Sequence, residues 1–192
     1  MRTILATATA LAALAAAPAL AQDACTIEGD HWDMGDAEVA ALYDCIEARM
    51  VEGYTKEGNA VAAEYRGWTP SATRMAVAGP HGERFLNTFV NDIGAAQYLA
   101  FAEGDFEMPV GSILAKESVA NRKGTARVGP LFIMEKVAAG GAAEAYDNWV
   151  YSGVQPNGKP LRISQDFCHD CHAAFEASDS MGYPLEEVRV SN

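Results

Sequence analysis

The segment GSILAKESVANRKGTARVGPLFIMEKV, residues 111–137, decides the fold of this 192-residue chain. Two runs rich in alternating apolar and polar residues, 111–119 and 127–137, flank the polar turn sequence Asn-Arg-Lys-Gly at 121–124. Alternation with period two is typical of β-strands, and a short turn that contains glycine joins neighbouring antiparallel strands. The segment therefore predicts two adjacent strands of an antiparallel sheet.

Working outward from this segment, the sequence patterns predict further strands and several helices. Strands are expected at 85–90 and 149–154, because both runs are rich in β-branched and aromatic residues. Apolar residues at helical spacing predict helices at 36–57, 60–65, 93–101 and 164–177. The expected class is α+β: N-terminal helices, then an antiparallel β-sheet, then a short C-terminal helix.

The first residues have the layout of a secretory signal peptide. A weakly basic start precedes an apolar run over 3–17, and small residues at Ala19 and Ala21 suit a signal peptidase. The run is short for a membrane anchor. We expect cleavage after Ala21, a periplasmic location, and a single domain over 22–192.

The composition is acidic, with a formal net charge of −12. This charge argues against binding to nucleic acids and to anionic membranes. It is compatible with docking to a basic, soluble redox partner, although solubility alone is the simpler explanation.

Two of the four cysteines, Cys25 and Cys45, lie near the start of the expected mature chain. Export permits disulfides, so we expect these two to pair and to tie the N-terminal segment to the first helix. In the chain-entropy model, a loop of this size contributes about 3 kcal/mol to stability.

The other two cysteines belong to the motif DFCHDCH, residues 166–172. Cys-x-x-Cys-His is the signature of covalent c-type haem attachment. On a helix, thiols three residues apart point the same way and can bond to both vinyl groups of one porphyrin. The motif predicts one haem c, bound through Cys168 and Cys171, with His172 as the iron ligand.

Three other interpretations of the motif remain open. A thioredoxin-like pair usually follows a strand early in a βαβ unit, whereas this motif is late in the chain. A zinc site would crowd Cys168, His169, Cys171 and His172 into five residues, which suits tetrahedral coordination badly. The third interpretation is a disulfide between the two cysteines.

Two ionisable residues in the expected sheet are candidate site residues. Alternation places Glu135 on one face with Leu131 and Ile133, where desolvation would raise the pKa of its carboxyl. The residues alone fit equally well a solvent-exposed Glu135 at the strand end, or one paired with Lys136 of a neighbouring chain. A lysine in mid-strand, such as Lys116, is most simply an edge charge that discourages aggregation.

An ordered set of stretches in the chain resembles the cytochrome P-460 family, which includes the cytochromes c′-β. The set covers most of the expected mature chain, and most clearly residues 81–190. It consists of HGERFLNTFVND, PVGSILAKES, GPLFIMEK, YDNWVYSGV and DFCHDCH followed by SDSMGYP.

The resemblance implies a periplasmic, mostly β, homodimeric protein whose five-coordinate haem has an open distal face. Cytochromes P-460 oxidise hydroxylamine to nitrogen oxides and bond a lysine to the porphyrin edge; this lysine lines up with Lys116. The family's distal carboxylate, which relays protons, lines up with Glu135. The family's pocket arginine falls at Asn87, so the chain departs from the pattern there.

Two rival functions remain open beside hydroxylamine oxidation. The cytochromes c′-β bind nitric oxide and lack the lysine bond, so the protein is alternatively a non-catalytic nitric-oxide-binding cytochrome. Simple electron transfer would need a sixth iron ligand, for which Met181 and His81 are candidates. We expect Met181 to pack in the core and His81 to stabilise a turn.

Overall fold

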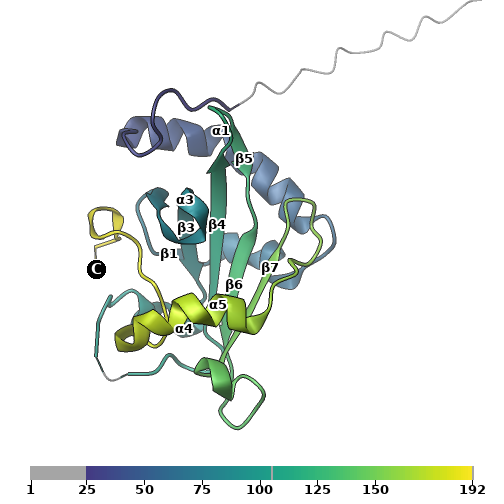
Figure 1. The fold of residues 1–192 in the computed structure, drawn as a ribbon, viewed down its shortest axis with the longest axis vertical. Coiled ribbons are helices and arrows are strands. Elements are labelled where there is room, and N and C mark those ends of the chain that lie inside the picture. Colours follow the sequence, from purple (N-terminus) through teal and green to yellow (C-terminus); the bar gives the residue numbers. More distant parts are fainter. Residues whose placement is uncertain (1–24, 105, 192) are drawn as a thin grey trace, which may run out of the picture.

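The computed structural model describes residues 25–104 and 106–191. The predicted signal peptide, 1–21, lies outside these residues. The described part of the chain forms one antiparallel sheet with helices against both of its faces (Figure 1). Among these residues, no helix is both long and apolar enough to cross a membrane.

The helices and strands follow one another in the predicted α+β order. The α-helices are α1 (Asp36–Thr55), α2 (Ala60–Glu64), α3 (Pro80–Glu83), α4 (Asp92–Tyr98) and α5 (Gln165–His172). The strands are β1 (Thr69–Pro70), β2 (Ala76–Ala78), β3 (Arg84–Val90), β4 (Ile113–Asn121), β5 (Ala126–Val128), β6 (Leu131–Lys136) and β7 (Trp149–Val154). Short 3-10 helices span Tyr65–Gly67, Glu144–Tyr146, Ala173–Ser178 and Glu186–Val188.

The seven-stranded sheet runs in the order β1-β3-β4-β6-β7, with β2 also paired to β3 and β5 to β4. The predicted antiparallel arrangement is confirmed, but the strand expected over 127–137 is two strands. Gly129 and Pro130 interrupt it, because proline has no backbone N–H to give to a ladder. A Cβ at Gly129 would lie 2.3 Å from Ser118 Oγ, so this close approach requires glycine.

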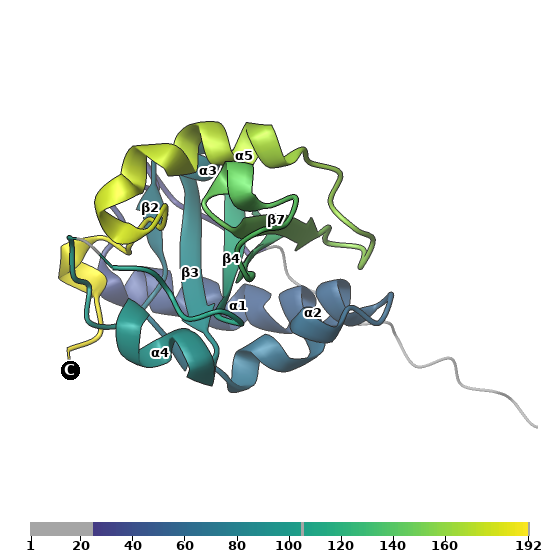
Figure 2. The same cartoon turned by 90° about the horizontal axis from the view of Figure 1, so that it is seen from below.

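The two faces of the sheet are covered by different helices. Figure 2 shows α1 and α2 on one face and α5 on the other. Directly paired residues share a face, so the pairs Lys116–Phe132 and Leu114–Met134 face α5, whereas Asn87–Glu117 and Ala115–Ile133 face α1. Apolar α1 residues pack against the second set: Val39, Leu42, Ile46 and Met50.

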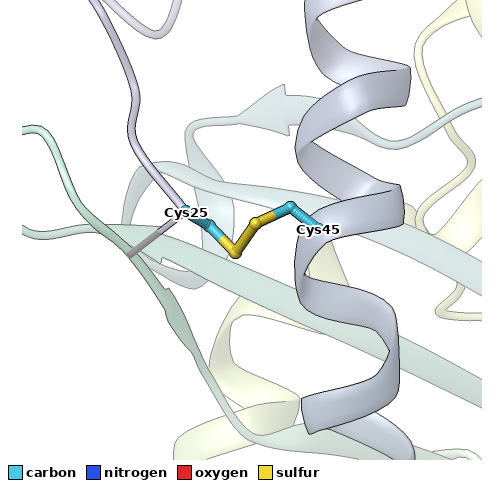
Figure 3. Close-up of a disulfide and its surroundings, with 2 residues drawn as sticks. All are labelled: Cys25 and Cys45. Carbon is cyan, nitrogen blue, oxygen red and sulfur yellow. A yellow bond between two sulfur atoms is a disulfide. The ribbon is translucent and has the colours of Figure 1, made fainter. Parts of the chain in front are cut away.

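The predicted disulfide between Cys25 and Cys45 is present (Figure 3). Cys45 lies in the middle of α1, and Cys25 lies in the segment that pairs with β5, where its carbonyl accepts from Ala126 N at 2.8 Å. The bond therefore joins the helical layer to the edge of the sheet.

A polar cluster is buried between α1 and the sheet. The carboxylate of Glu117, which is 1% exposed, accepts hydrogen bonds from Tyr43 Oη at 2.8 Å, Tyr65 Oη at 2.6 Å and Arg66 Nη2 at 2.6 Å. Arg66 also pairs with Glu47. Both oxygens of the buried carboxylate are thus satisfied, as burial of a charge requires.

Candidate functional site

A cleft lies between the sheet and α5, on the face opposite α1. Its lining comes from α3, β4, β6, β7 and α5, and the side chains able to take part in chemistry are His81, Lys116, Tyr151, Cys168 and His172. Its walls also include the apolar Leu114, Phe132 and Met134. The cleft therefore combines an apolar lining with a few convergent polar groups, as small-molecule and cofactor sites do.

The helix α5 brings the Cys-x-x-Cys-His motif to the cleft. Ser164 caps the helix by accepting from Phe167 N at 3.2 Å. Cys168, Cys171 and His172 then fall on one turn, with Cys168 half-buried in the cleft wall and Cys171 exposed. Both thiols are free, so neither forms the disulfide that was one interpretation of the motif.

His172 is held in one tautomer. Its Nδ1 lies 2.8 Å from the carbonyl oxygen of Ser180, and a carbonyl only accepts, so Nδ1 carries the proton. The second ring nitrogen, Nε2, is therefore the one with a lone pair. Burial lowers the pKa of His172 to about 4, which keeps the ring neutral at neutral pH. A neutral imidazole whose other N–H donates to a backbone carbonyl is the usual form of a metal ligand.

A buried ion pair fixes the carbonyl that orients His172. Lys136 Nζ lies 2.7 Å from Asp179 Oδ1, and the other carboxylate oxygen of Asp179 accepts from Met108 N. Trp149 Nε1 donates to the carbonyl of Asp179 at 2.7 Å. Together these contacts hold residue 179 and its neighbour Ser180 in the left-handed region, with φ of 51° and 60°.

Lys116 lies in the middle of β4, and its side chain lines the cleft. Because β4 pairs with β3 on one side and β6 on the other, the interpretation of Lys116 as an edge charge is wrong. Burial lowers the pKa of its amine to about 8. In the described part of the chain, no carboxylate lies within ion-pair distance of this amine.

Glu135 does not share the cleft. It pairs with Ile113 across the sheet, so it faces away from Lys116 and Phe132, and its side chain is exposed. The alternation argument correctly grouped Glu135 with Ile133, but that face packs on α1 and not on α5. The expectation of a proton-relaying Glu135 above the haem is therefore corrected. Asn87 also faces α1, opposite Glu117, so the departure from the family's arginine does not change the cleft.

The other interpretations of the motif fit the structure less well. His169 points to Tyr151 Oη and Asp147, at 3.3 and 3.9 Å, and not to a shared site with the thiols. No group of three or more His, Cys, Asp or Glu side chains within 25–104 and 106–191 is arranged to hold a metal ion. A loop, and not a strand, immediately precedes α5, unlike a thioredoxin-type motif.

The donors in the cleft and at its edge fit a covalently attached haem. Two free thiols lie one helical turn apart, the next residue is a neutral imidazole with Nε2 available, and the wall between them is apolar. A scan against protein-family models and a search of curated proteins both gave no match to this chain. The assignment therefore depends on the residues of the cleft and on the resemblance described above.

Proposed function

We propose that this protein is an exported monohaem c-type cytochrome of the P-460 type, with Cys168 and Cys171 as the thioether residues and His172 as the proximal ligand. The observation that carries the proposal is the hydrogen bond from His172 Nδ1 to the carbonyl of Ser180, beside two free thiols on the same helical turn. A histidine that merely packs in a core has no need of this arrangement with adjacent thiols.

The haem supplies the redox chemistry when it is bound. The residues of the chain orient the iron ligand and exclude water from the cleft. Ser180 orients His172 and increases the basicity of its free nitrogen. The apolar walls exclude water, which strengthens every electrostatic interaction in the cleft.

The leading activity is the oxidation of hydroxylamine to nitrogen oxides, with the electrons passed to a soluble acceptor. Lys116 supports this choice. With a pKa of about 8, a substantial fraction of its amine is neutral near physiological pH. A neutral amine can accept a proton from a bound substrate. Lys116 is also the residue at which the resemblance places the bond to the porphyrin. With Glu135 on the other face, Lys116 is the proton acceptor we propose for the cleft.

The test is hydroxylamine-dependent reduction of an artificial electron acceptor by the haem-loaded protein. Lys116→Met should lower turnover at least about a hundredfold, the lower end of the range for a lost general base. The exposed Lys159→Met should leave turnover unchanged. Equal turnover in Lys116→Met and the parent would contradict the role of Lys116, and a haem-loaded parent without turnover would contradict the activity.

A second candidate function is electron transfer, and one observation favours it. The ring of His81 lies in the same cleft as His172, with 6.2 Å between the two ring centroids. The family resemblance implies an open face at that position, so the contact needs its own explanation.

A further inference from the structure

His81 reaches the cleft from an unusual turn. The short α3 lies between β2 and β3, and three consecutive residues in it have positive φ: His81 at 65°, Gly82 at 77° and Glu83 at 53°. Positive φ costs free energy at residues other than glycine. Arg84 Nη1 donates to the carbonyl of His81 at 2.7 Å, which stabilises the turn through the backbone. The predicted turn role of His81 thus uses its carbonyl and leaves its side chain unexplained.

The imidazole of His81 packs inside the cleft. Its centroid lies 4.5 Å from that of Phe132 and 6.2 Å from that of His172, with the two imidazole planes 70° apart. Neither ring nitrogen of His81 has a hydrogen-bond partner among the residues that the structure describes. Neither nitrogen is among the buried side-chain atoms that lack a partner, so both are accessible to solvent and to a ligand that enters the cleft.

The spacing of the two rings matches that of two imidazoles on one metal ion. Each metal–nitrogen bond is about 2.0 Å, so two opposed nitrogens lie about 4 Å apart and the ring centroids roughly 6 Å apart. The observed separation is 6.2 Å. The Nδ1 of His172 is already engaged by Ser180, which leaves Nε2 for such a role.

Met181, the other candidate for the sixth position, is excluded by its location. It is 0% exposed and packs in the core with Val90, Tyr98 and Trp149. It is absent from the cleft lining, so the earlier expectation that it packs in the core is confirmed.

We propose that His81 is the second axial ligand in the resting protein and closes the position that a small molecule needs. The inference depends on the proposed haem site and adds a gate to it: hydroxylamine or nitric oxide must displace His81 before it can bind.

The test uses the haem-loaded protein, His81→Ala and the control His169→Ala, which removes a histidine of α5 outside the cleft lining. The ferric parent and the control should show low-spin, six-coordinate absorption and electron paramagnetic resonance spectra. His81→Ala should be high-spin, and free imidazole should restore its low-spin spectrum. Cyanide should bind His81→Ala at least about tenfold faster than the parent, because the competing ligand is gone.

Two results would overturn the proposal. One is a high-spin ferric parent, which needs no variant and so does not depend on whether His81→Ala folds. The other is a low-spin spectrum retained in His81→Ala. A parent that carries no covalent haem would instead contradict the proposed function itself, so the two failures are distinguishable.

Discussion

Lys116 and Glu117 are neighbours in β4, but their side chains lie on opposite faces of the sheet and in different environments. Glu117 faces α1, where two tyrosines and Arg66 satisfy its carboxylate. Lys116 faces α5, where burial lowers the pKa of its amine and no ion-pair partner is found among the described residues. The comparison teaches that one strand can bury a fully paired carboxylate on one face and direct an amine without an ion-pair partner into the cleft on the other.

The largest expected effect concerns the cleft. The double substitution of Cys168→Ala and Cys171→Ala should abolish covalent haem completely, because both thioether sulfurs are removed. Haem staining of a denaturing gel measures the effect. His169→Ala is the matched control and should keep its haem. Covalent haem in the double variant would show that the cleft is not the attachment site.

The next effect concerns the opposite face. Glu117→Gln should lower the free energy of unfolding by about 3 kcal/mol, since it removes the charge that Arg66 and both tyrosines surround. The exposed Glu135→Gln should change it by less than about 0.5 kcal/mol. Urea denaturation measures both. Haem content should be unchanged in each variant. Similar losses of unfolding free energy in the two variants would contradict the different roles of Glu117 and Glu135.

A smaller effect should appear in the pH dependence of the haem-free double variant. Burial lowers the pKa of Lys116 in the folded protein to about 8, from an ordinary value of 10.5. Between these values the unfolded state binds the extra proton, so the free energy of unfolding should rise with pH, by about 2 kcal/mol after allowance for partial exposure. The measured quantity is the difference from the same protein with Lys116→Met, which cancels the titration of other groups. A difference that is flat from pH 7.5 to 10 would mean that the amine is not desolvated.

The smallest expected effect is a change in the free energy of unfolding, and its sign is the informative part. In the haem-free double variant at pH 7, Lys116→Met should increase the free energy of unfolding by about 1 kcal/mol, because it removes a buried cation and keeps an apolar stem. Urea denaturation checks this. Destabilisation would indicate that Lys116 stabilises the fold, as Glu117 does, and would contradict the different roles assigned to the two residues.

Much of the fold follows from local sequence patterns. The alternation around residues 111–137 predicted the sheet, and the helical spacing after Asp36 predicted α1. The expected export, with Cys25 and Cys45 both near the start of the mature chain, predicted the disulfide. The Cys-x-x-Cys-His motif was also expected on a helix near the C-terminus, and α5 carries it. These features depend on residues close in sequence or on one covalent bond, so local rules suffice.

The composition of the cleft was harder to predict because it depends on which helix covers which face. Alternation groups Glu135 with Ile133 but cannot tell that this face receives α1. The contact of His81 with His172, and the support of Ser180 by Lys136 and Asp179, join segments far apart in the chain. No local pattern indicates such pairs; only the strand register and the return of α5 over the sheet bring them together.

The central claim is that α5 and the sheet hold one haem covalently. The most direct test is the intact mass of the mature protein under denaturing conditions, after production together with the c-type haem attachment machinery. Covalent attachment predicts the mass of the polypeptide plus one haem, and loss of that increment in the double cysteine variant. A mass equal to that of the polypeptide alone would contradict it.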